Sequence, residues 1–550
     1  MSADNFTPHD MIDLSSPMLL QFLRNASKET LQEKLNTVAA AVGDEAFSRR
    51  VAREIVQSTR PQQAIPEVYG HYRSVLQDGI TFFLSQVGRP RLIELVITQL
   101  KLNPEADTRE RLLALAKQFP TLHKLGQIIA RNPGTDPVLK KWLVHLENGC
   151  YGTPLEGMIE RIGGELEKTG HRDQVNIRPV IISEASVGAV IPFQRNDPSS
   201  PEDVDGVFKI LKPGIERKLE EELLILEKTA AFFEKNRSRY PLKDLKFLGI
   251  FQEIREMLVR EIDLAAERDH LIEAARFFKG MERIEIPKIF PFSTGAITAM
   301  KYLNGPKITE ASLTRDQRKH CAALLFDALV CRPLFSPDQN SLFHGDPHAG
   351  NILALKDTPS GPPRIGLVDW SQAGRLTKRD RVKIIQLTRA VYTKDMSNIR
   401  RAVKALDRST SLASPTKRQE FRNLVLGMIQ SPEFFRMTLI KRTFNLLKQL
   451  TFMGFVFPAE LMLFRKAILT LQGVLYDLWP EFDMNAAVRQ YLKSLMIREV
   501  PRRFCNLFLP LADRPENYWS LISNTDLQSL AVYQYIGAGR SGARSRARYH

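Results

Sequence analysis

The sequence predicts an α+β fold of two lobes, preceded by a helical N-terminal region. Residues 18–118 carry apolar residues at spacings of three and four, which is the period of an amphipathic helix. Short apolar runs typical of strands begin after Gly170, and a mainly helical pattern returns over residues 309–478. Because strands, helices and further strands together build one lobe of an α+β protein, we expect a strand-rich lobe followed by a helical lobe.

The composition supports a folded protein and favours anionic partners. The chain has 550 residues, of which 43% are hydrophobic and 25% are charged, and this excludes disorder as the dominant state. The net charge of +16 favours nucleic acid, anionic lipid or phosphorylated small molecules without choosing among them. Four arginines in the C-terminal tail are weak evidence for contact with nucleic acid or lipid headgroups, so we expect no specific nucleic-acid binding.

The cysteines and the N-terminal residues indicate a cytoplasmic protein. The four cysteines lie far apart and form no CxxC pair, which suggests neither a disulfide scaffold nor a zinc ribbon. The first thirty residues contain four acidic side chains and no basic start followed by an apolar core, so we expect no secretory signal. The most apolar stretch, residues 450–463, is interrupted by Pro458 and Glu460 and is shorter than the ~20 residues that span a bilayer.

Helices are predicted on both sides of the first strands. One helical region covers residues 18–118, and a second covers residues 121–166 and is broken by a turn cluster at 132–137. Two later helices are predicted at residues 215–235 and 245–278.

Short apolar runs mark the predicted strands. The first three lie at residues 180–182, 187–193 and 207–211. Polar residues 196–201 join the second and third runs as a hairpin loop, and a β-like pair follows around residues 284–289 and 296–302. The C-terminal helical pattern is interrupted by residues 343–376, where motif residues crowd together.

The strongest chemical signal is the run His-Gly-Asp-Pro-His-Ala-Gly-Asn at residues 344–351, followed by an apolar strand that ends in Asp369. Asp346, Asn351 and Asp369 have the spacing of the catalytic Asp, metal-binding Asn and metal-binding Asp of kinase-fold phosphotransferases. Mg²⁺ takes carboxylate and amide oxygens, and a separate carboxylate must orient the attacking hydroxyl or water. Two alternatives are turn-capping by Asp346 and Asn351, and a zinc site of His344, Asp346 and His348, although the sequence has no second dense His cluster and no HExxH helix.

A lysine and a partner carboxylate complete the predicted phosphate site. Lys209 lies on a predicted strand about 20 residues after the small-residue turn at 183–188, from which it would contact the α and β phosphates. The helical segment after Arg260 offers Glu261, Asp263 and Glu267 as partners, with the last two one turn apart on one face. The alternatives are a solvated edge lysine and a solvated acidic helix face.

These motifs together resemble the UbiB/AarF family of atypical protein-kinase-like proteins, over about residues 122–483. Lys124-Leu125-Gly126-Gln127 is similar to the KxGQ motif of the family, and Glu261-Ile262-Asp263 is similar to its ExD motif. Ala185-Ser186-Val187-Gly188 stands where the family carries an alanine-rich loop, and Lys209 to Gly214 resembles its lysine strand and following Pro-Gly.

The resemblance implies a two-lobed protein-kinase-like fold with a helical KxGQ extension, and ATP and Mg²⁺ as cofactors. It implies Asp346 as the catalytic acid, Lys209 paired with Glu267, and Mg²⁺ on Asn351 and Asp369. The implied ATP-binding residues are Lys209, Ala185, Ser186, Val187, Gly188, Met300 and Tyr302. The implied family-specific regulatory residues are Lys124, Gln127, Glu261 and Asp263.

With the resemblance, the chain divides into five expected parts. They are an N-terminal helical region (1–118), the KxGQ extension (119–175), a kinase-like N-lobe (176–306), a kinase-like helical C-lobe (307–515) and a C-terminal basic tail (516–550). The part of the tail after Gly537 has four arginines among Gly, Ser and Ala, and we expect it to bury too little apolar surface to fold.

The implied function is ATP binding and hydrolysis, or phosphoryl transfer, in support of isoprenoid lipid or quinone biosynthesis. Two alternatives stay open: a small-molecule phosphotransferase of the aminoglycoside or choline kinase type, and a nucleotide-binding pseudokinase scaffold. Asp369-Trp370 is typical of the first alternative, which shares the His-Gly-Asp and the Asn, whereas the resembled family usually has Phe-Gly after this Asp. Retention of Lys209, Asp346, Asn351 and Asp369 argues against the second.

Other departures from the family pattern concern Glu184, Ala349 and Lys301. Glu184 occupies a usually small position in the alanine-rich loop, where its carboxylate would repel phosphate or bind a cation. Ala349 replaces a common Pro, and Lys301 stands where the family often has Glu.

An anionic membrane surface or an isoprenoid lipid is a further partner to consider, with peripheral membrane contact of a cytoplasmic protein. Residues 434–457 mix Phe, Leu and Met with Arg and Lys, which is typical of an amphipathic surface on anionic lipid. Apolar residues cover most of this helix, and this favours the alternative, burial in the helical lobe.

Overall fold

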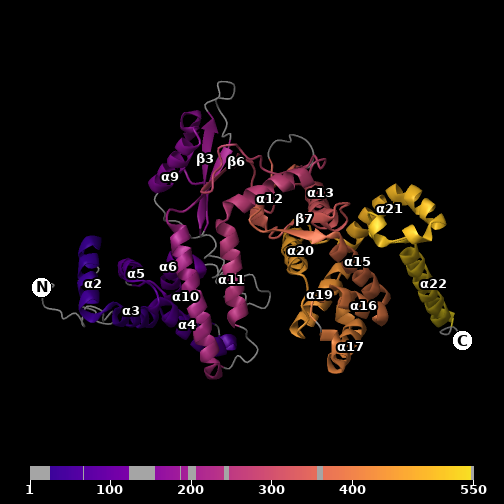
Figure 1. The fold of residues 1–550 in the computed structure, drawn as a ribbon, viewed down its shortest axis with the longest axis horizontal. Helices are drawn as coiled ribbons and strands as arrows, with labels where there is room; N and C mark the ends of the chain where they lie inside the picture. The colour runs from indigo at the N-terminus through magenta and orange to yellow at the C-terminus, as the bar shows by residue number, and fades with distance from the viewer. Residues whose placement is uncertain are drawn as a thin grey trace. The chain divides into compact units, whose positions relative to one another are not determined.

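The computed structural model describes residues 25–65, 67–103, 105–122, 155–185, 187–195, 206–240, 247–355, 363–409 and 411–546 (Figure 1). It divides into two compact units. The first comprises Met1–Ala265 and Phe290–Met300, and the second comprises Ala266–Ile289 and Lys301–His550. These two units do not test the predicted division into five parts, which stays a prediction. The first unit contains both the N-terminal helices and the sheet of the predicted N-lobe.

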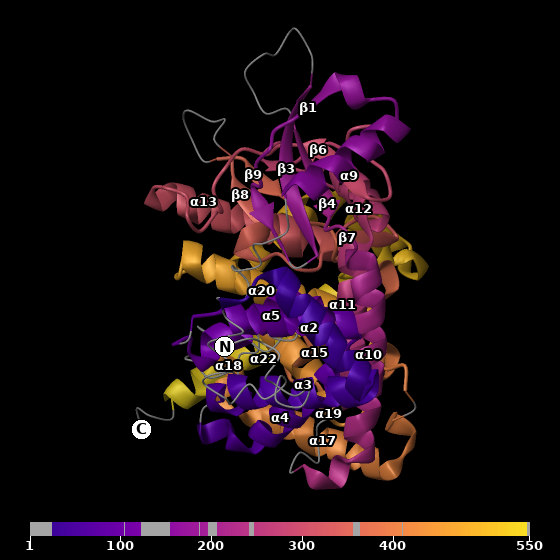
Figure 2. The same ribbon diagram turned by 90° about the vertical axis from the view of Figure 1, so that its left-hand side faces the viewer.

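The N-terminal region is helical, as predicted. Its helices are α2 (Lys28–Val42), α3 (Asp44–Thr59), α4 (Arg73–Ser85), α5 (Arg89–Lys101) and α6 (Thr108–Gln118). Their buried side chains, among them Phe47, Phe83 and Leu95, form one apolar core with residues of α10 (Ile215–Lys235). In Figure 2, α10 runs along this group of helices. An ion pair reinforces the contact, because the partly buried Arg91 binds the buried carboxylate of Glu222 of α10 at 2.5 Å.

A five-stranded sheet forms the other part of the first unit. Its strands are β1 (Val175–Ile177), β2 (Ser183–Glu184), β3 (Gly188–Arg195), β4 (Gly206–Leu211) and β6 (Ile297–Lys301). The order is β1-β3-β4-β6, with β2 also paired to β3. Antiparallel pairing of β3 with β4 confirms the predicted hairpin, whose loop lies outside the described residues. The prediction of a strand at 180–182 is wrong, since the chain there is irregular between β1 and β2, with Val180 and Ile182 exposed and Ile181 partly buried.

Helix α9 (Leu155–Lys168) covers one face of this sheet. Its buried residues Met158, Ile162 and Leu166 pack with Phe193 and Phe208 of the hairpin. Phe193 and Phe208 lie 4.4 Å apart between ring centroids, within a cluster that also includes two phenylalanines just ahead of β6. This aromatic core holds β4, the strand of Lys209, in a fixed register.

The predicted helix at 245–278 is two helices. They are α11 (Phe247–Ile262) and α12 (Leu264–Phe277). The break falls at Asp263, which is exposed, whereas Glu267 is 1% exposed. The expectation that these two carboxylates share one helix face is therefore wrong, because Asp263 belongs to neither helix.

The second unit combines short strands with a helical body. Its strands form a two-stranded sheet of β7 (Asn340–His344) and β10 (Ala373–Thr377), and a three-stranded sheet of β5 (Ile284–Glu285), β9 (Ile365–Leu367) and β8 (Ile352–Ala354). Its helices are α13 (Arg315–Phe326), a π-helical turn (Asp327–Cys331), α14 (Arg332–Leu334), α15 (Lys378–Thr393), α16 (Met396–Leu406), α17 (Pro415–Gln430), α18 (Pro432–Arg436), α19 (Leu439–Phe452), α20 (Ala459–Leu478), α21 (Met484–Phe508) and α22 (Asn524–Arg546). The predicted β-like pair at 284–289 and 296–302 is confirmed in part. The amide of Phe290 donates to the carbonyl of Ala299 at 2.9 Å and that of Lys301 to the carbonyl of Lys288 at 2.8 Å, whereas β5 pairs with β9 in a different sheet from β6.

The C-terminal tail differs from the prediction, since α22 extends through Arg540, Arg544 and Arg546. Asp526 stabilises the start of this helix. It accepts a hydrogen bond from the amide of Ser523 and forms an ion pair with Arg389 of α15. Forming the first turn of a helix is unfavourable in free energy, whereas each further residue adds a hydrogen bond at little entropic cost. A helix anchored at its first turn can therefore continue to Arg546.

Most apolar side chains of residues 434–457 are buried or partly buried, which supports the alternative of burial in the helical lobe. Phe434, Phe444, Leu447 and Phe455 are buried, whereas Phe452 is exposed. Within the part of the chain that the structure describes, no helix has the length and hydropathy needed to cross a membrane.

Candidate functional site

The loop with Asp346, the predicted catalytic acid, follows strand β7 of the second unit. Antiparallel pairing of β7 with β10 places His344 opposite Ala373. Just beyond this pair, the amide of Gly345 donates to the carbonyl of Gln372 at 2.7 Å. A Cβ atom on Gly345 would lie 2.7 Å from that same oxygen. The loop can therefore leave the strand in this direction only with glycine at 345.

His344 fixes the backbone at Asp346. The amide of Asp346 donates to Nδ1 of His344 at 3.2 Å, so Nδ1 carries no proton. The proton is then on Nε2, which donates to the carbonyl of Val368 at 3.1 Å. Burial holds the pKa of His344 below its usual range, although the nearby carboxylates of Asp369 and Asp346 act in the opposite direction.

Asn351 and Asp369 meet at one end of the β8–β9 hairpin. Asn351 directly precedes β8, Asp369 follows β9 by two residues, and the amide of Val368 donates to the carbonyl of Asn351 at 3.0 Å. The side-chain NH2 of Asn351 donates to the carbonyl of Asp346 at 3.1 Å. This bond leaves the amide oxygen of Asn351 as the atom available to a cation.

Asp369 has a left-handed backbone, with φ of 56°. Such a conformation costs a non-glycine residue about 1 kcal/mol or more, and Asp tolerates it better than most side chains. The carboxylate Oδ1 accepts the amide of Ser371 at 3.3 Å, which holds the turn that follows. The strain is a reason to regard the position of this carboxylate as functional.

Trp370 locks the Asp369 turn onto α12. Its side chain is fully buried, and its ring lies 4.7 Å from that of His344 between centroids. Its carbonyl accepts a hydrogen bond from Nδ1 of His270 at 3.0 Å. His270 lies one turn after Glu267 on α12, so the buried Glu267 carboxylate and the Asp369 turn lie on the same side of this helix.

His270 and Trp370 as a packing pair were missed by sequence reasoning. A single histidine on a helix gives no recognisable spacing, and Trp370 was noted only as a departure after the metal-binding Asp. The sequence did contain a usable signal. His270 follows Glu267 by three residues, and this spacing places it on the same helix face as that predicted catalytic carboxylate.

The remaining predicted site residues lie in the first unit or at its boundary. Lys209 is in β4 opposite Val190, and Met300 is a buried residue of β6. Tyr302 directly follows β6 and belongs to the second unit. Because Lys209 and Glu267 belong to different units, their pairing stays a prediction.

The turn between β2 and β3 is tightly held. The amide of Ala185 donates to the carbonyl of Gly188 at 2.8 Å, and the amide of Lys212 donates to the carbonyl of Val187 at 2.9 Å. A Cβ atom on Gly188 would lie 2.7 Å from the carbonyl oxygen of Ile210, so glycine is required for β3 to approach β4 here. The side chain of Val187 is buried in the core of the unit, and Ser186 lies outside the described residues.

Glu184 forms an ion pair with Lys212 at 2.7 Å, and the side chains are 2% and 13% exposed. From the sequence alone, the Glu184 carboxylate is expected to repel phosphate or to bind a cation. With Lys212 beside it, its charge is compensated within the protein.

The KxGQ residues Lys124 and Gln127 lie outside the described residues. Glu261 lies in α11, and Asp263 lies between α11 and α12. The regulatory roles of these four residues stay predictions.

The zinc interpretation conflicts with the hydrogen bonds. Both ring nitrogens of His344 are used by backbone groups, and Nδ1 of His348 accepts the amide of Gly350 at 3.0 Å. Within the described ranges, no three His, Cys, Asp or Glu side chains are arranged to hold a metal ion. Two oxygen ligands suit Mg²⁺ better, because this ion commonly completes its shell with phosphate and water.

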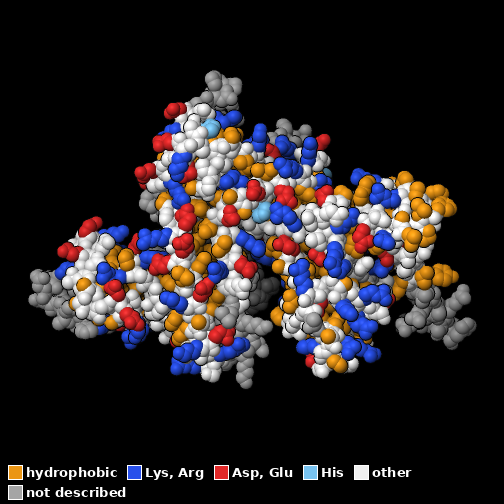
Figure 3. Space-filling view, viewed as in Figure 1, with side chains coloured by type: hydrophobic (Ala, Val, Ile, Leu, Met, Phe, Trp, Pro, Cys, Tyr) orange, Lys and Arg blue, Asp and Glu red, His pale blue; other side chains and the backbone are white. Residues whose placement is uncertain are grey.

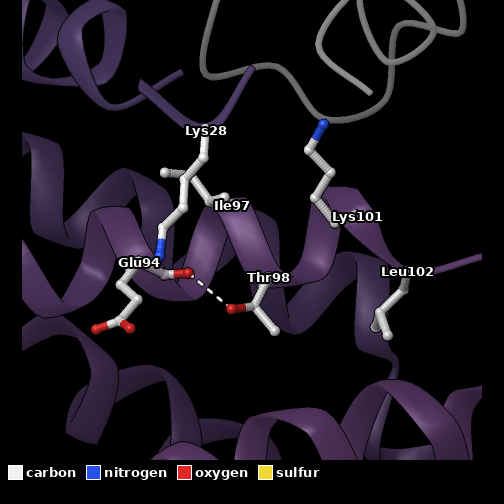
Figure 4. A pocket seen from close by; sticks show the side chains of 6 residues that line it. All are labelled: Lys28, Glu94, Ile97, Thr98, Lys101 and Leu102. Atoms are coloured by element: carbon white, nitrogen blue, oxygen red, sulfur yellow. Dashed lines mark hydrogen bonds between the residues drawn. The ribbon is translucent and has the colours of Figure 1, made fainter. Parts of the chain in front are cut away.

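A surface groove in the N-terminal helices does not include any of the predicted site residues. It is lined by Lys28, Glu94, Ile97, Thr98, Lys101 and Leu102 (Figure 4). Lys101 reaches the carbonyl of Ala26 at 2.6 Å, and Thr98 donates to the carbonyl of Glu94. None of the lining residues is a predicted site residue.

Comparison with known proteins gives the following similarities. Residues 174–403 match the family described as the ABC1 atypical kinase-like domain. The chain is 24% identical over 408 residues to probable protein kinase UbiB of Aliivibrio fischeri, covering 72% of each chain. It is 26% identical over 395 residues to the uncharacterized protein sll1770 of Synechocystis, covering 70% of this chain and 64% of that protein.

A solved structure, the complex of Rv3197 with erythromycin from Mycobacterium tuberculosis, covers 59% of this chain and 79% of its own, with 18% identity and a TM-score of 0.40. The segment that matches the ABC1 domain contains Lys209, Asp346, Asn351 and Asp369.

Proposed function

Because the chain belongs to the UbiB/AarF family of atypical kinase-like proteins, we propose that it binds Mg-ATP and hydrolyses it or transfers its terminal phosphoryl group. We propose further that this activity supports isoprenoid lipid or quinone biosynthesis. The observation that carries the proposal is the β8–β9 hairpin, whose register brings Asn351 and Asp369 together next to the Asp346 loop.

The donor set fits Mg²⁺. Asp369 supplies a carboxylate on a fixed turn, and Asn351 supplies an amide oxygen whose direction is set by the bond from its NH2 group to the carbonyl of Asp346. Both are hard oxygen ligands of the kind this ion prefers. When bound with ATP, Mg²⁺ neutralises charge on the phosphate oxygens.

Asp346 is a carboxylate separate from this pair, and we assign it the orientation of the attacking water or hydroxyl group. The residue is 7% exposed. Its backbone N–H donates to the ring of His344, and its carbonyl accepts from the side chain of Asn351. Catalysis of phosphoryl transfer depends mainly on such positioning. Lys209 of β4 is the proposed ligand of the α and β phosphates.

The Asp-Trp sequence does not favour a small-molecule acceptor. Trp370 is a fully buried residue that packs on His344 and Phe278, and its indole N–H donates to the carbonyl of Leu367 at 3.3 Å. A packing role of this kind accounts for the tryptophan without any contact to substrate.

The test is steady-state phosphate release from Mg-ATP by the purified chain. Asp369→Asn removes the metal-binding carboxylate while conserving its size, and we expect it to lower turnover by at least a hundredfold. Asp316→Asn, an exposed acid in the first turn of α13, is the matched control and should be unaffected. Nucleotide binding without turnover in the wild type would instead favour a pseudokinase scaffold.

The pathway needs a separate measurement. Deleting the gene from its own host should lower a quinone or another isoprenoid lipid, and the Asp369→Asn allele should fail to restore it. An unchanged lipid profile in the deletion strain would remove the biosynthetic part of the proposal and leave the ATPase part intact.

A further inference from the structure

Helix α21 carries a row of large apolar side chains on its exposed face. Ile497, Val500, Phe504, Leu507 and Phe508 recur at spacings of three and four, and each is between 56% and 72% exposed. The row continues past the end of the helix with Leu509 and Leu511, which are 61% and 88% exposed. Figure 3 shows hydrophobic side chains gathered over this part of the second unit, at the right of the view.

The opposite face of the same helix is polar and buried. Glu499 is 3% exposed, and its carboxylate accepts hydrogen bonds from the amide and hydroxyl of Ser520 at 2.6 and 2.9 Å. Arg503 binds Glu499 at 2.6 Å and donates to the carbonyl of Ile522, and Asn506 donates to the hydroxyl of Tyr518. These bonds fix the rotation of α21 about its axis.

This orientation is the reverse of an ordinary surface helix. In a protein surrounded only by water, the apolar stripe of an amphipathic helix faces the core and the polar stripe faces solvent. Here a satisfied polar network holds the polar stripe inward, so the apolar stripe faces outward. An exposed contiguous apolar surface of this kind marks a site of interaction.

The charges of the helix identify the partner as anionic. Between Met484 and Phe508, Glu499 is the one acidic residue, and it is buried against Arg503. Lys493, Arg498 and Arg502 are exposed along the same helix. A second copy meeting this face would bring like charges together, whereas an anionic lipid surface would neutralise them.

The dimensions favour a helix that lies on a bilayer. The row from Ile497 to Phe508 is about 17 Å long at the rise of an α-helix, well short of the hydrocarbon thickness of a membrane. Apolar and aromatic side chains with flanking Lys and Arg are the composition of helices that lie in the headgroup region. We propose that α21 is the surface by which the chain docks on an anionic lipid bilayer.

The proposal is tested by co-sedimentation of the full chain with vesicles, without nucleotide. One set of vesicles is phosphatidylcholine alone, and the other has equal parts phosphatidylcholine and phosphatidylglycerol. We expect binding to the second set, weakened by added salt because exposed charges are screened. The double variant Phe504→Ser/Phe508→Ser should bind at least tenfold more weakly, and each of Arg498→Gln and Arg502→Gln should lower binding about fivefold.

The matched control is the double variant Phe452→Ser/Tyr476→Ser. It removes two aromatic side chains that are 74% and 65% exposed in α19 and α20, and it should bind as the wild type does. Equal loss in both double variants, or no binding of the wild type to anionic vesicles, overturns the proposal. A wild-type dimer that Phe504→Ser/Phe508→Ser converts to a monomer in sedimentation velocity assigns the face to a second copy instead.

Because no step of this test measures turnover, it can fail while the proposed function stands. Conversely, the turnover measured for Asp369→Asn does not affect the result expected for vesicle binding. The inference therefore names a lipid surface for the proposed function without depending on its chemistry.

Discussion

The backbone amide of Asp346 is hydrogen-bonded to Nδ1 of His344 at 3.2 Å, and this bond requires a neutral histidine. A proton on Nδ1 would remove the acceptor and place two N–H groups against each other. The geometry of the predicted catalytic loop is thus tied to the protonation state of His344, whose two ring nitrogens both bond to backbone groups.

A pH dependence of stability follows from His344. Burial lowers the pKa of His344 in the folded protein, so between this pKa and the ordinary value of about 6.5 the unfolded chain binds more protons than the folded one. The contribution is fully present above about pH 6.5 and is lost as the pH falls below that value. Thermal unfolding followed from pH 8 to about pH 5 should show this loss in the wild type.

The control for this measurement is a histidine that is exposed. His320→Gln replaces an exposed side chain of α13 and should leave the pH profile unchanged, whereas His344→Gln should flatten it. An identical slope in the wild type and in His344→Gln would show that the acid sensitivity arises elsewhere.

Gly345→Ala should destabilise the second unit by about 1–3 kcal/mol, the usual cost of forcing extra atoms into a packed site. The new Cβ would lie 2.7 Å from the carbonyl oxygen of Gln372, so the loop or β10 must move. Gly427→Ala is the opposite case, because nothing lies within 4 Å of a Cβ at that helical position. It should be neutral or stabilising by up to about 1 kcal/mol, and urea unfolding compares the two variants.

Much of the fold is predictable from apolar spacing. The helical N-terminal region, α10 and the β3–β4 hairpin each have a long or alternating pattern that one local rule recognises. The break at Asp263 was missed because its neighbours Ile262 and Leu264 keep the apolar pattern continuous through it. Helix α22 was missed because a composition rule ignores the anchor that Asp526 makes with Arg389.

The sequence predicts the main residues of the candidate site but not the tertiary contacts around them. Asp346, Asn351 and Asp369 were recognised from spacing, and the structure brings the last two together through a short hairpin. The buried partner of Glu184 could not be foreseen, because Lys212 lies 28 residues later and pairs with it only after β3 and β4 fold together. Contacts of this kind depend on tertiary packing and leave no periodic signal.

The Glu184–Lys212 pair makes a testable prediction about stability. Lys212→Met leaves a buried carboxylate without its cation, which should lower the free energy of unfolding by about 3 kcal/mol. Adding Glu184→Gln should recover most of this loss, because the uncompensated charge is then removed. A double-mutant cycle by urea unfolding measures the coupling, and additive effects of the two changes would show that the pair is not energetically linked.

Trp370→Ala should lower the stability by about 3–5 kcal/mol, since it opens a cavity among His344, Phe278 and the turn at Asp369. Trp370→Phe keeps an aromatic ring but loses the bond from the indole N–H to Leu367, so a smaller loss of about 1 kcal/mol is expected. The informative quantity is Mg-ATP turnover of Trp370→Phe at a temperature where it is fully folded. Turnover close to that of the wild type supports a packing role, because phenylalanine fills the site without reproducing any polar contact of tryptophan. A large fall in turnover with stability retained would mean that the indole acts on the substrate, and would return the small-molecule phosphotransferase interpretation to first place.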